Sequence, residues 1–155
     1  MYIKLKIGVK KMEEMVNKLN EFLADLNVFY RKLQNYHWNV KGKNFFVLHE
    51  KLEEYYDKIN EEIDEIAEHI LTLDKQPLGT MKDYLEKTCI EEAKNAKIEG
   101  EIVLDKILKD FETLLQKVIT IKKLADEHHI YATSSLMDDY ILEYSKIIWM
   151  LKQHK

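Results

Sequence analysis

Interruptions of helical structure are rare in this chain, which has only four glycines and one proline among its 155 residues. Between these interruptions, apolar residues recur three and four positions apart, which is the spacing of one face of an α-helix. Four long segments show this pattern. A chain of this length can bury roughly 68–70% of its unfolded surface without needing disulfides. We therefore predict a single all-α domain over residues 1–155.

The first two predicted helices are close neighbours along the chain. The first runs from about Lys11 to Val40, and Gly42 stops it because glycine tolerates the left-handed conformation that ends helices. Asn44 is a suitable N-cap for the second helix, which Pro77 and Gly79 are expected to end. Because the link between the two helices is short, we expect them to pack as an antiparallel hairpin.

The last two predicted helices form a second hairpin. The third helix is expected within about residues 91–127, and residues 128–132 form a short turn. Thr133 or Ser134 is then expected to cap the fourth helix. This short connection again predicts antiparallel neighbours.

The link between the two hairpins, about residues 75–96, is long for a compact bundle. It can run the roughly 45 Å of a thirty-residue helix, which allows the second and third helices to be parallel. Within it, residues 80–87 carry enough apolar side chains for a short extra helix. The predicted architecture is a four-helix bundle with one long crossover, the arrangement of ferritin-like proteins.

Two histidines and two carboxylates point to a metal site. His37 continues the apolar stripe of the first helix, whereas His49, Asp64 and Glu68 share one stripe of the second. Imidazole and carboxylate together suit iron and its neighbours in the first transition row. Asp64 and Glu68 are four residues apart and can chelate, but Asp64 lies roughly 22 Å along the helix from His49. One chain cannot bridge that gap, whereas an antiparallel twofold partner could.

Each of these residues also has an ordinary interpretation. The carboxylates belong to an acidic helix face that includes Asp57 and Glu61, and most such faces are simply solvated. The histidines could be packed or surface residues. The Glu-x-x-His motif of ferritin-like sites within one bundle is absent from this sequence. Only Asp126 and His129 come near that spacing, and they lie at a predicted helix end.

The chain resembles the Dps proteins, also called miniferritins, over nearly its whole length. The segments that carry this resemblance are YHWNVKG at 36–42, FFVLHEKLEEYYD at 45–57, Asp64 with Ala67-Glu68, and Trp149-Met150-Leu151. The combination of Tyr-His-Trp and Leu-His-Glu at this spacing is specific to the family.

The resemblance implies a function. Miniferritins form a hollow dodecamer, oxidise Fe(II) at sites on twofold subunit interfaces, preferably with hydrogen peroxide, and store the ferric product as a mineral. Fe(II) and peroxide are thereby removed together, which protects DNA. Trp38 matches the family's indole beside the metal site, which is thought to intercept oxidising equivalents. Whether each site holds one iron or two is left open.

The resemblance also assigns the site residues. His37 and His49 match the ligands that one subunit supplies, and Asp64 and Glu68 match the ligands from its partner. Glu53 matches a position where the family often has an additional acidic residue near the metal.

DNA binding is the less determined trait. Some family members bind DNA through Lys-rich tails, and residues 1–11 contain Lys4, Lys6, Lys10 and Lys11. These lysines alternate with apolar residues, so the tail could equally form a small strand or an ordered cap. The formal net charge of −4 argues against general affinity for nucleic acid.

Two alternatives to a ferroxidase remain: a nucleoid-binding protein that compacts DNA, and a structural helical bundle without chemistry. The lone Cys89 fits a reducing compartment. We find no apolar run of membrane-spanning length and no signal-peptide pattern. The expected location is therefore the cytoplasm, at the nucleoid if the protein binds DNA.

Overall fold

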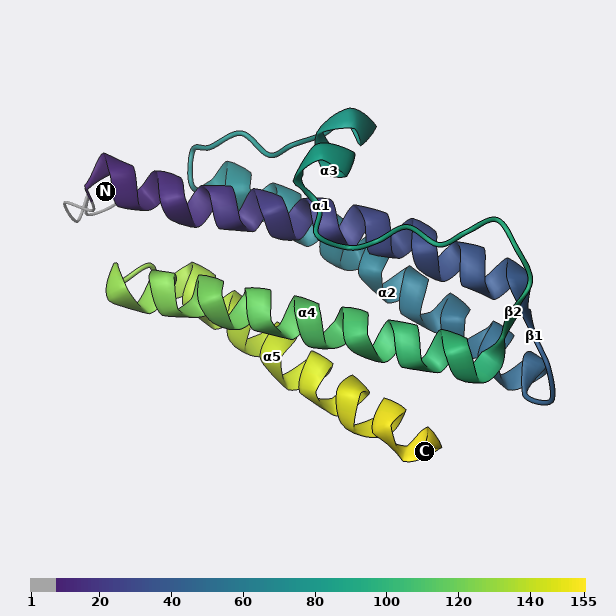
Figure 1. The fold of residues 1–155 in the computed structure, drawn as a ribbon. Helices are drawn as coiled ribbons and strands as arrows, with labels where there is room; N and C mark the ends of the chain where they lie inside the picture. The colour runs from purple at the N-terminus through teal and green to yellow at the C-terminus, as the bar shows by residue number, and fades with distance from the viewer. Residues whose placement is uncertain (1–7) are drawn as a thin grey trace.

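The computed structural model describes residues 8–155, and four long helices dominate it (Figure 1). The predicted all-α four-helix bundle is confirmed. In chain order the elements are α1 (Val9–Asn39), β1 (Val40–Lys41), α2 (Phe45–Thr72), α3 (Met81–Lys87), β2 (Ile98–Glu99), α4 (Gly100–Glu127), α5 (Tyr131–Leu151) and the 3₁₀ helix η1 (Lys152–His154). Across residues 8–155, no helix is long and apolar enough to span a membrane.

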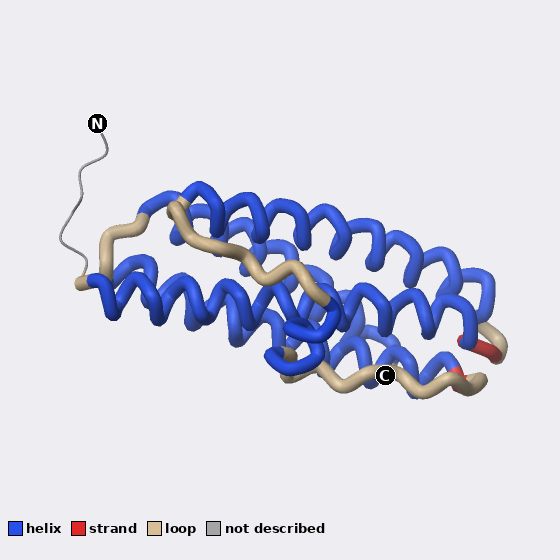
Figure 2. The backbone as a smooth tube through the Cα atoms, turned by 90° about the horizontal axis from the view of Figure 1, so that it is seen from above, coloured by secondary structure: helices blue, strands red, loops and turns tan. Residues whose placement is uncertain are grey.

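The long crossover sets the direction of the helices. α1 pairs with α2 and α4 pairs with α5 as two antiparallel hairpins. Residues 73–99 travel along the outside of the bundle from one end to the other (Figure 2). As predicted, α2 and α4 therefore run in the same direction. At the end of the crossover, β2 pairs in parallel with β1, with Val40 opposite Ile98.

The short helix predicted within the crossover is also confirmed as α3. The hydroxyl oxygen of Thr80 accepts a hydrogen bond from the backbone N–H of Asp83 (3.2 Å), which is a standard N-cap interaction. Tyr84 is buried, and its hydroxyl donates to the carbonyl of Leu78 (3.0 Å). This side chain therefore fixes the crossover against the bundle.

The N-terminal boundary of the bundle differs slightly from the prediction. α1 begins at Val9, so Lys10 and Lys11 belong to the helix and not to a separate tail. The other two lysines of the predicted tail, Lys4 and Lys6, lie outside the described residues. α1 ends one residue before the predicted Val40.

The boundaries of α2 test two predictions about helix ends. Asn44 occupies the N-cap position, but its side chain makes no capping hydrogen bond to any described residue. The prediction that Pro77 and Gly79 end this helix is wrong, because α2 already ends at Thr72. Asp74 adopts a left-handed conformation with φ of 58°. Aspartate tolerates this conformation better than most residues, and it terminates the helix before the proline is reached.

The predicted cap of the last helix is wrong as well. α5 begins two residues before Thr133, and Ile130 is its N-cap, with no side-chain cap bond within the described part of the chain. Thr133 and Ser134 are buried inside the helix, where other side chains engage their hydroxyls. Thr133 Oγ1 lies 2.7 Å from His69 Nε2, and the Ser134 hydroxyl donates to the Asp126 carboxylate (2.5 Å).

A buried carboxylate ties the crossover to the bundle. Asp25 of α1 is fully buried and lies 2.6 Å from the ammonium of Lys117 on α4. The same carboxylate accepts hydrogen bonds from the Thr88 hydroxyl and the Cys89 backbone N–H, each at 2.8 Å. Since α1, α4 and the crossover all contribute to this cluster, it fixes the route that the crossover takes over the bundle.

Candidate metal centre

His37 and His49 lie side by side where α1 and α2 meet at the first hairpin. Their rings stack with centroids 3.7 Å apart and planes 15° apart. His37 Nδ1 lies 2.6 Å from the carbonyl oxygen of His49, and His49 Nδ1 lies 2.8 Å from the carbonyl oxygen of His37. A carbonyl oxygen can only accept, so each Nδ1 carries a proton. In the neutral form of each ring the lone pair is then on Nε2, the atom through which a histidine oriented in this way binds a metal ion.

The position of His37 near the end of α1 explains half of this arrangement. The last four carbonyl groups of a helix have no partner within the helix. The carbonyl of His37 is one of these, and the imidazole of His49 donates to it. The exchange is reciprocal, so each histidine orients the ring of the other.

The turn between the two histidines is held by the crossover. Gly42, within this turn, has a φ of +114°, which residues with a side chain rarely adopt. The ammonium of the preceding Lys41 lies 3.0 Å from the carboxylate of Glu99 in β2. At Gly100 a Cβ atom would lie 2.5 Å from Cδ1 of Leu48, so any other residue at this position would force the Leu48 side chain to move. The parallel contact of β1 with β2 therefore supports the hairpin that carries the histidines.

Aromatic rings surround the pair. Phe45 stacks on His49 with centroids 5.1 Å apart, and Tyr56 meets His37 edge-on at 5.4 Å. Burial raises the pKa of Tyr56, and the carboxylates of Glu53 and Asp57 raise it further. No role was inferred for Tyr56 from the sequence, although its position seven residues after His49 places it on the same side of α2.

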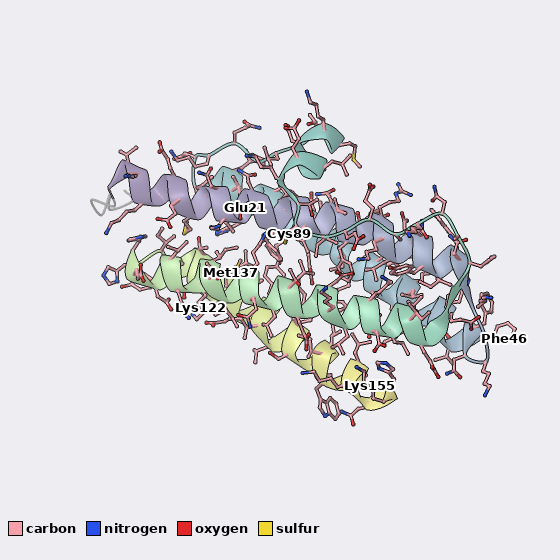
Figure 3. The ribbon with its side chains drawn as sticks, in the orientation of Figure 1. Glu21, Phe46, Cys89, Lys122, Met137 and Lys155 are labelled. Carbon is pink, nitrogen blue, oxygen red and sulfur yellow. The ribbon has the colours of Figure 1, made fainter. Side chains whose placement is uncertain are left out.

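Trp38 is more remote from the histidines than its position in the sequence suggests. Its indole is 54% exposed, and the guanidinium of Arg31 lies 5.9 Å from the ring centroid. Among residues 8–155, no ring contact joins this indole to His37 or His49. Phe46, which Figure 3 labels at the tip of the hairpin, is also strongly exposed. The end of the bundle that carries the two histidines therefore exposes aromatic side chains to solvent.

Asp64 and Glu68 lie elsewhere on the surface of the same chain. Both are exposed on α2, where they line a shallow depression together with Glu61, Glu65, His69, Thr72 and Leu136. Glu53 is exposed nearer to the histidines. In the described part of the chain, no group of three or more His, Cys, Asp or Glu side chains is placed to hold one metal ion. A single chain therefore assembles the two imidazoles and, separately, the two carboxylates.

A buried acid between α2 and α5 escaped the sequence analysis. Glu62 is 3% exposed and accepts a hydrogen bond from the fully buried Tyr144 (2.5 Å). Burial raises the pKa of Glu62 to about 8, and the nearby Glu143 adds to the increase. Its Oε1 has no hydrogen-bond partner among residues 8–155. The sequence did carry a signal, because Glu62 lies three residues after Ile59 on the apolar stripe of α2.

Comparison with known proteins identifies relatives of similar sequence and fold. A family model described as ferritin-like domain matches residues 16–155. The chain is 39% identical over 83 residues to DNA protection during starvation protein 2 of Bacillus anthracis, and the match spans 54% of this chain and 56% of that protein. The chain therefore matches only about half the length of this curated relative.

Two crystal structures are similar over almost their full length. A Dps protein from Vibrio cholerae O1, described as a member of a broad superfamily of ferritin-like diiron-carboxylate proteins, has a TM-score of 0.89 and 40% identity, covering 93% of this chain and 90% of its own. A Dps protein from Bacillus brevis has a TM-score of 0.91 and 32% identity, covering 96% and 99%.

Proposed function

Because this chain belongs to the Dps family of ferritin-like proteins, we propose that it oxidises Fe(II) to Fe(III) at sites shared between subunits. We further propose that hydrogen peroxide is its preferred oxidant and that the ferric product is stored inside a hollow shell of twelve copies. The curated relative is named for DNA protection. Consuming Fe(II) and peroxide together would protect DNA, because these two reagents generate hydroxyl radicals when they meet freely.

The histidine pair is the observation that carries this proposal. Both imidazoles keep Nε2 free while the backbone holds Nδ1, so the pair is preorganised for a cation without further rearrangement. Neutral imidazoles bind Fe(II) without adding charge. Two ligands leave most positions around the ion open for carboxylates and for the oxidant.

We propose that the partner chain supplies the carboxylates. Within one chain, the roughly 22 Å of helix between His49 and Asp64 excludes a common ion. An antiparallel copy of α2 would place its Asp64 and Glu68 beside the histidines of the first chain. The exposed aromatic surface at the histidine end gives such a copy an apolar area to cover. Carboxylates favour Fe(III) over Fe(II) because they are hard anionic ligands, so this ligand set promotes oxidation.

Two further residue assignments extend the proposal. Glu53 is proposed as an additional acidic group near the iron, and Trp38 as an interceptor of oxidising equivalents. A location in the cytoplasm rests on the single Cys89 and stays a prediction. Direct DNA binding stays an alternative that the net charge of −4 argues against, and Lys4 and Lys6 lie outside the described residues. A gel-shift titration at stated salt concentrations tests it.

Subunit mixing tests the shared site. His49→Ala chains and Glu68→Ala chains should each be inactive alone, because every site in either shell lacks one ligand. In a co-assembled shell, each mixed dimer should regain one complete site, from the histidine of one chain and the acid of the other. Random assortment should restore about a quarter of the wild-type number of sites, given the twofold symmetry of the interface.

The double variant His49→Ala/Glu68→Ala, co-assembled with wild-type chains in equal amounts, is the matched control. Mixed dimers then have no complete site, so only wild-type dimers act and about a quarter of the wild-type number of sites should remain. If each chain held its own complete site, about half would remain. Fe(II) oxidation is followed by the absorbance of the ferric product, and co-assembly is verified by mass spectrometry. No regained oxidation in verified mixed shells would show that the ligands are not shared in this way.

A further inference from the structure

A site that holds a single Fe(II) needs a second electron donor to reduce hydrogen peroxide to water. Reduction of hydrogen peroxide to two waters needs two electrons, whereas one Fe(II) supplies one. Without a second donor, breaking the O–O bond releases a hydroxyl radical. An oxidisable side chain in contact with the iron-binding imidazoles would supply the missing electron.

Tyr56 is in contact with the histidine pair. Its ring meets His37 edge-on with centroids 5.4 Å apart and planes at 85°. The Tyr56 ring also meets the Tyr30 ring edge-on, with centroids 5.9 Å apart and planes at 90°. The hydroxyl of Tyr30 accepts a hydrogen bond from Gln34 (3.1 Å). Three rings in succession therefore lead from the imidazole into the α1–α2 interface, a short route for an electron.

Tyr56 also has a base beside it. A phenol loses an electron most readily when its proton leaves at the same time, because a neutral radical then forms in place of a cation. Glu53 precedes Tyr56 by three residues, so the two side chains lie on the same face of α2. Glu53 is exposed, so a proton that its carboxylate accepts can pass on to water.

Trp38 is less suited to be the first donor. The positive charge of Arg31 over its ring opposes the loss of an electron, since an oxidised indole is itself cationic before it loses a proton. Within residues 8–155, its ring contacts neither imidazole. Arg31 is also the only arginine of the chain, and no carboxylate among the described residues pairs with it to neutralise this charge.

Resting on the ferroxidase function proposed above, we infer that Tyr56 is the one-electron donor to this site and that Glu53 accepts its proton. With one Fe(II) bound, the step is Fe(II) + Tyr56–OH + H₂O₂ + H⁺ giving Fe(III) + Tyr56–O• + 2 H₂O. The O–O bond breaks, and iron and tyrosine each lose one electron. The phenolic proton passes through Glu53 to solvent, and two protons from solvent complete the two waters.

The next Fe(II) to bind then reduces the tyrosyl radical. A second Fe(II) reduces Tyr56–O• to the phenol and takes up one proton on the tyrosine oxygen, leaving Fe(III). Over both steps, two Fe(II) and one peroxide consume two protons and give two Fe(III) and two waters. A site with one ion bound thus completes the same overall reaction as a site with two, without releasing a hydroxyl radical.

Freeze-quench electron paramagnetic resonance tests the inference on the assembled wild-type protein, loaded anaerobically with one Fe(II) per site and mixed with hydrogen peroxide. We expect a radical whose spectrum narrows when the protein carries ring-deuterated tyrosine. Tyr56→Phe keeps the ring and removes only the hydroxyl, so it should fold but lose this signal. Its shells should release more hydroxyl radical to a spin trap than wild type does.

Two further variants separate the assignment from a structural role. Trp38→Phe should keep the tyrosyl signal, and Glu53→Gln should form it more slowly and with a smaller solvent deuterium effect. A tyrosyl radical that survives in Tyr56→Phe, or a radical that vanishes in Trp38→Phe, overturns the inference. So does wild-type protein that oxidises Fe(II) without any tyrosyl signal. Wild-type protein that does not oxidise Fe(II) at all refutes the proposed ferroxidase function as well.

Discussion

Replacing Glu62 with glutamine should stabilise the folded protein in neutral and mildly alkaline solution. Glu62 is buried between α2 and α5, and burial raises its pKa from 4.5 to about 8. The unfolded chain ionises this carboxyl near pH 4.5, whereas the folded chain holds the proton until about pH 8. The folded state therefore binds more protons between these two values, and its stability falls as the pH rises through them.

The size of the effect follows from the same two values. At roughly 1.4 kcal/mol per pH unit, the gap from 4.5 to about 8 corresponds to about 5 kcal/mol at most. Glutamine has nearly the shape of the protonated acid, and its amide oxygen can still accept from Tyr144. The glutamine amide does not ionise, so the variant does not lose stability as the pH rises. We expect the stability of the variant relative to wild type to increase by several kcal/mol between about pH 5 and about pH 9.

Urea unfolding at a fixed protein concentration, repeated across this pH range, measures the difference directly. Because all other titrating groups are shared, their contributions cancel between the two proteins. Glu61→Gln is the matched control, since it removes the same charge from an adjacent position whose side chain is 75% exposed. The control should follow wild type. A constant difference between Glu62→Gln and wild type at every pH would mean that Glu62 is not held neutral, and the reasoning would be wrong.

Three further predictions concern the contacts of the crossover. Gly100→Ala should lower the free energy of unfolding by about 1–3 kcal/mol in urea titrations, because the new Cβ would overlap Leu48; unchanged stability would show that Leu48 moves freely. Lys117→Met should lower it by about 3–5 kcal/mol by leaving the Asp25 carboxylate buried and unpaired, and a shift below 1 kcal/mol in thermal unfolding would contradict this. Burial and the Asp25 carboxylate raise the pKa of the Cys89 thiol, whereas the Lys117 ammonium lowers it. Iodoacetamide should therefore alkylate Cys89 more slowly in the folded than in the unfolded protein, and more slowly still in folded Lys117→Met. Equal alkylation rates would refute the raised pKa.

Much of the fold was predictable because helical periodicity is a local property. The direction in which a side chain points depends on its spacing along the helix, so the four stripes indicated the core and the burial of His37. The link length predicted the parallel course of α2 and α4. Helix ends were less predictable, because they depend on competition between neighbours. Asp74 ended α2 before Pro77 was reached, and Thr133 bonded to a distant histidine and did not cap α5.

The candidate site divides in the same way. From the sequence alone came the residue types, the chelating spacing of Asp64 and Glu68, and the distance that separates them from His49. Only the tertiary structure decided that the imidazoles of His37 and His49 orient each other through backbone carbonyls.

Tertiary structure likewise decided two contacts between distant parts of the chain. Glu62 meets Tyr144, a residue 82 positions away, and β2 closes on β1 beside the histidine hairpin. The physical reason is that periodicity specifies which side of a helix is buried. The partner that it meets there, and with it the protonation of a buried carboxyl, depends on how the helices pack.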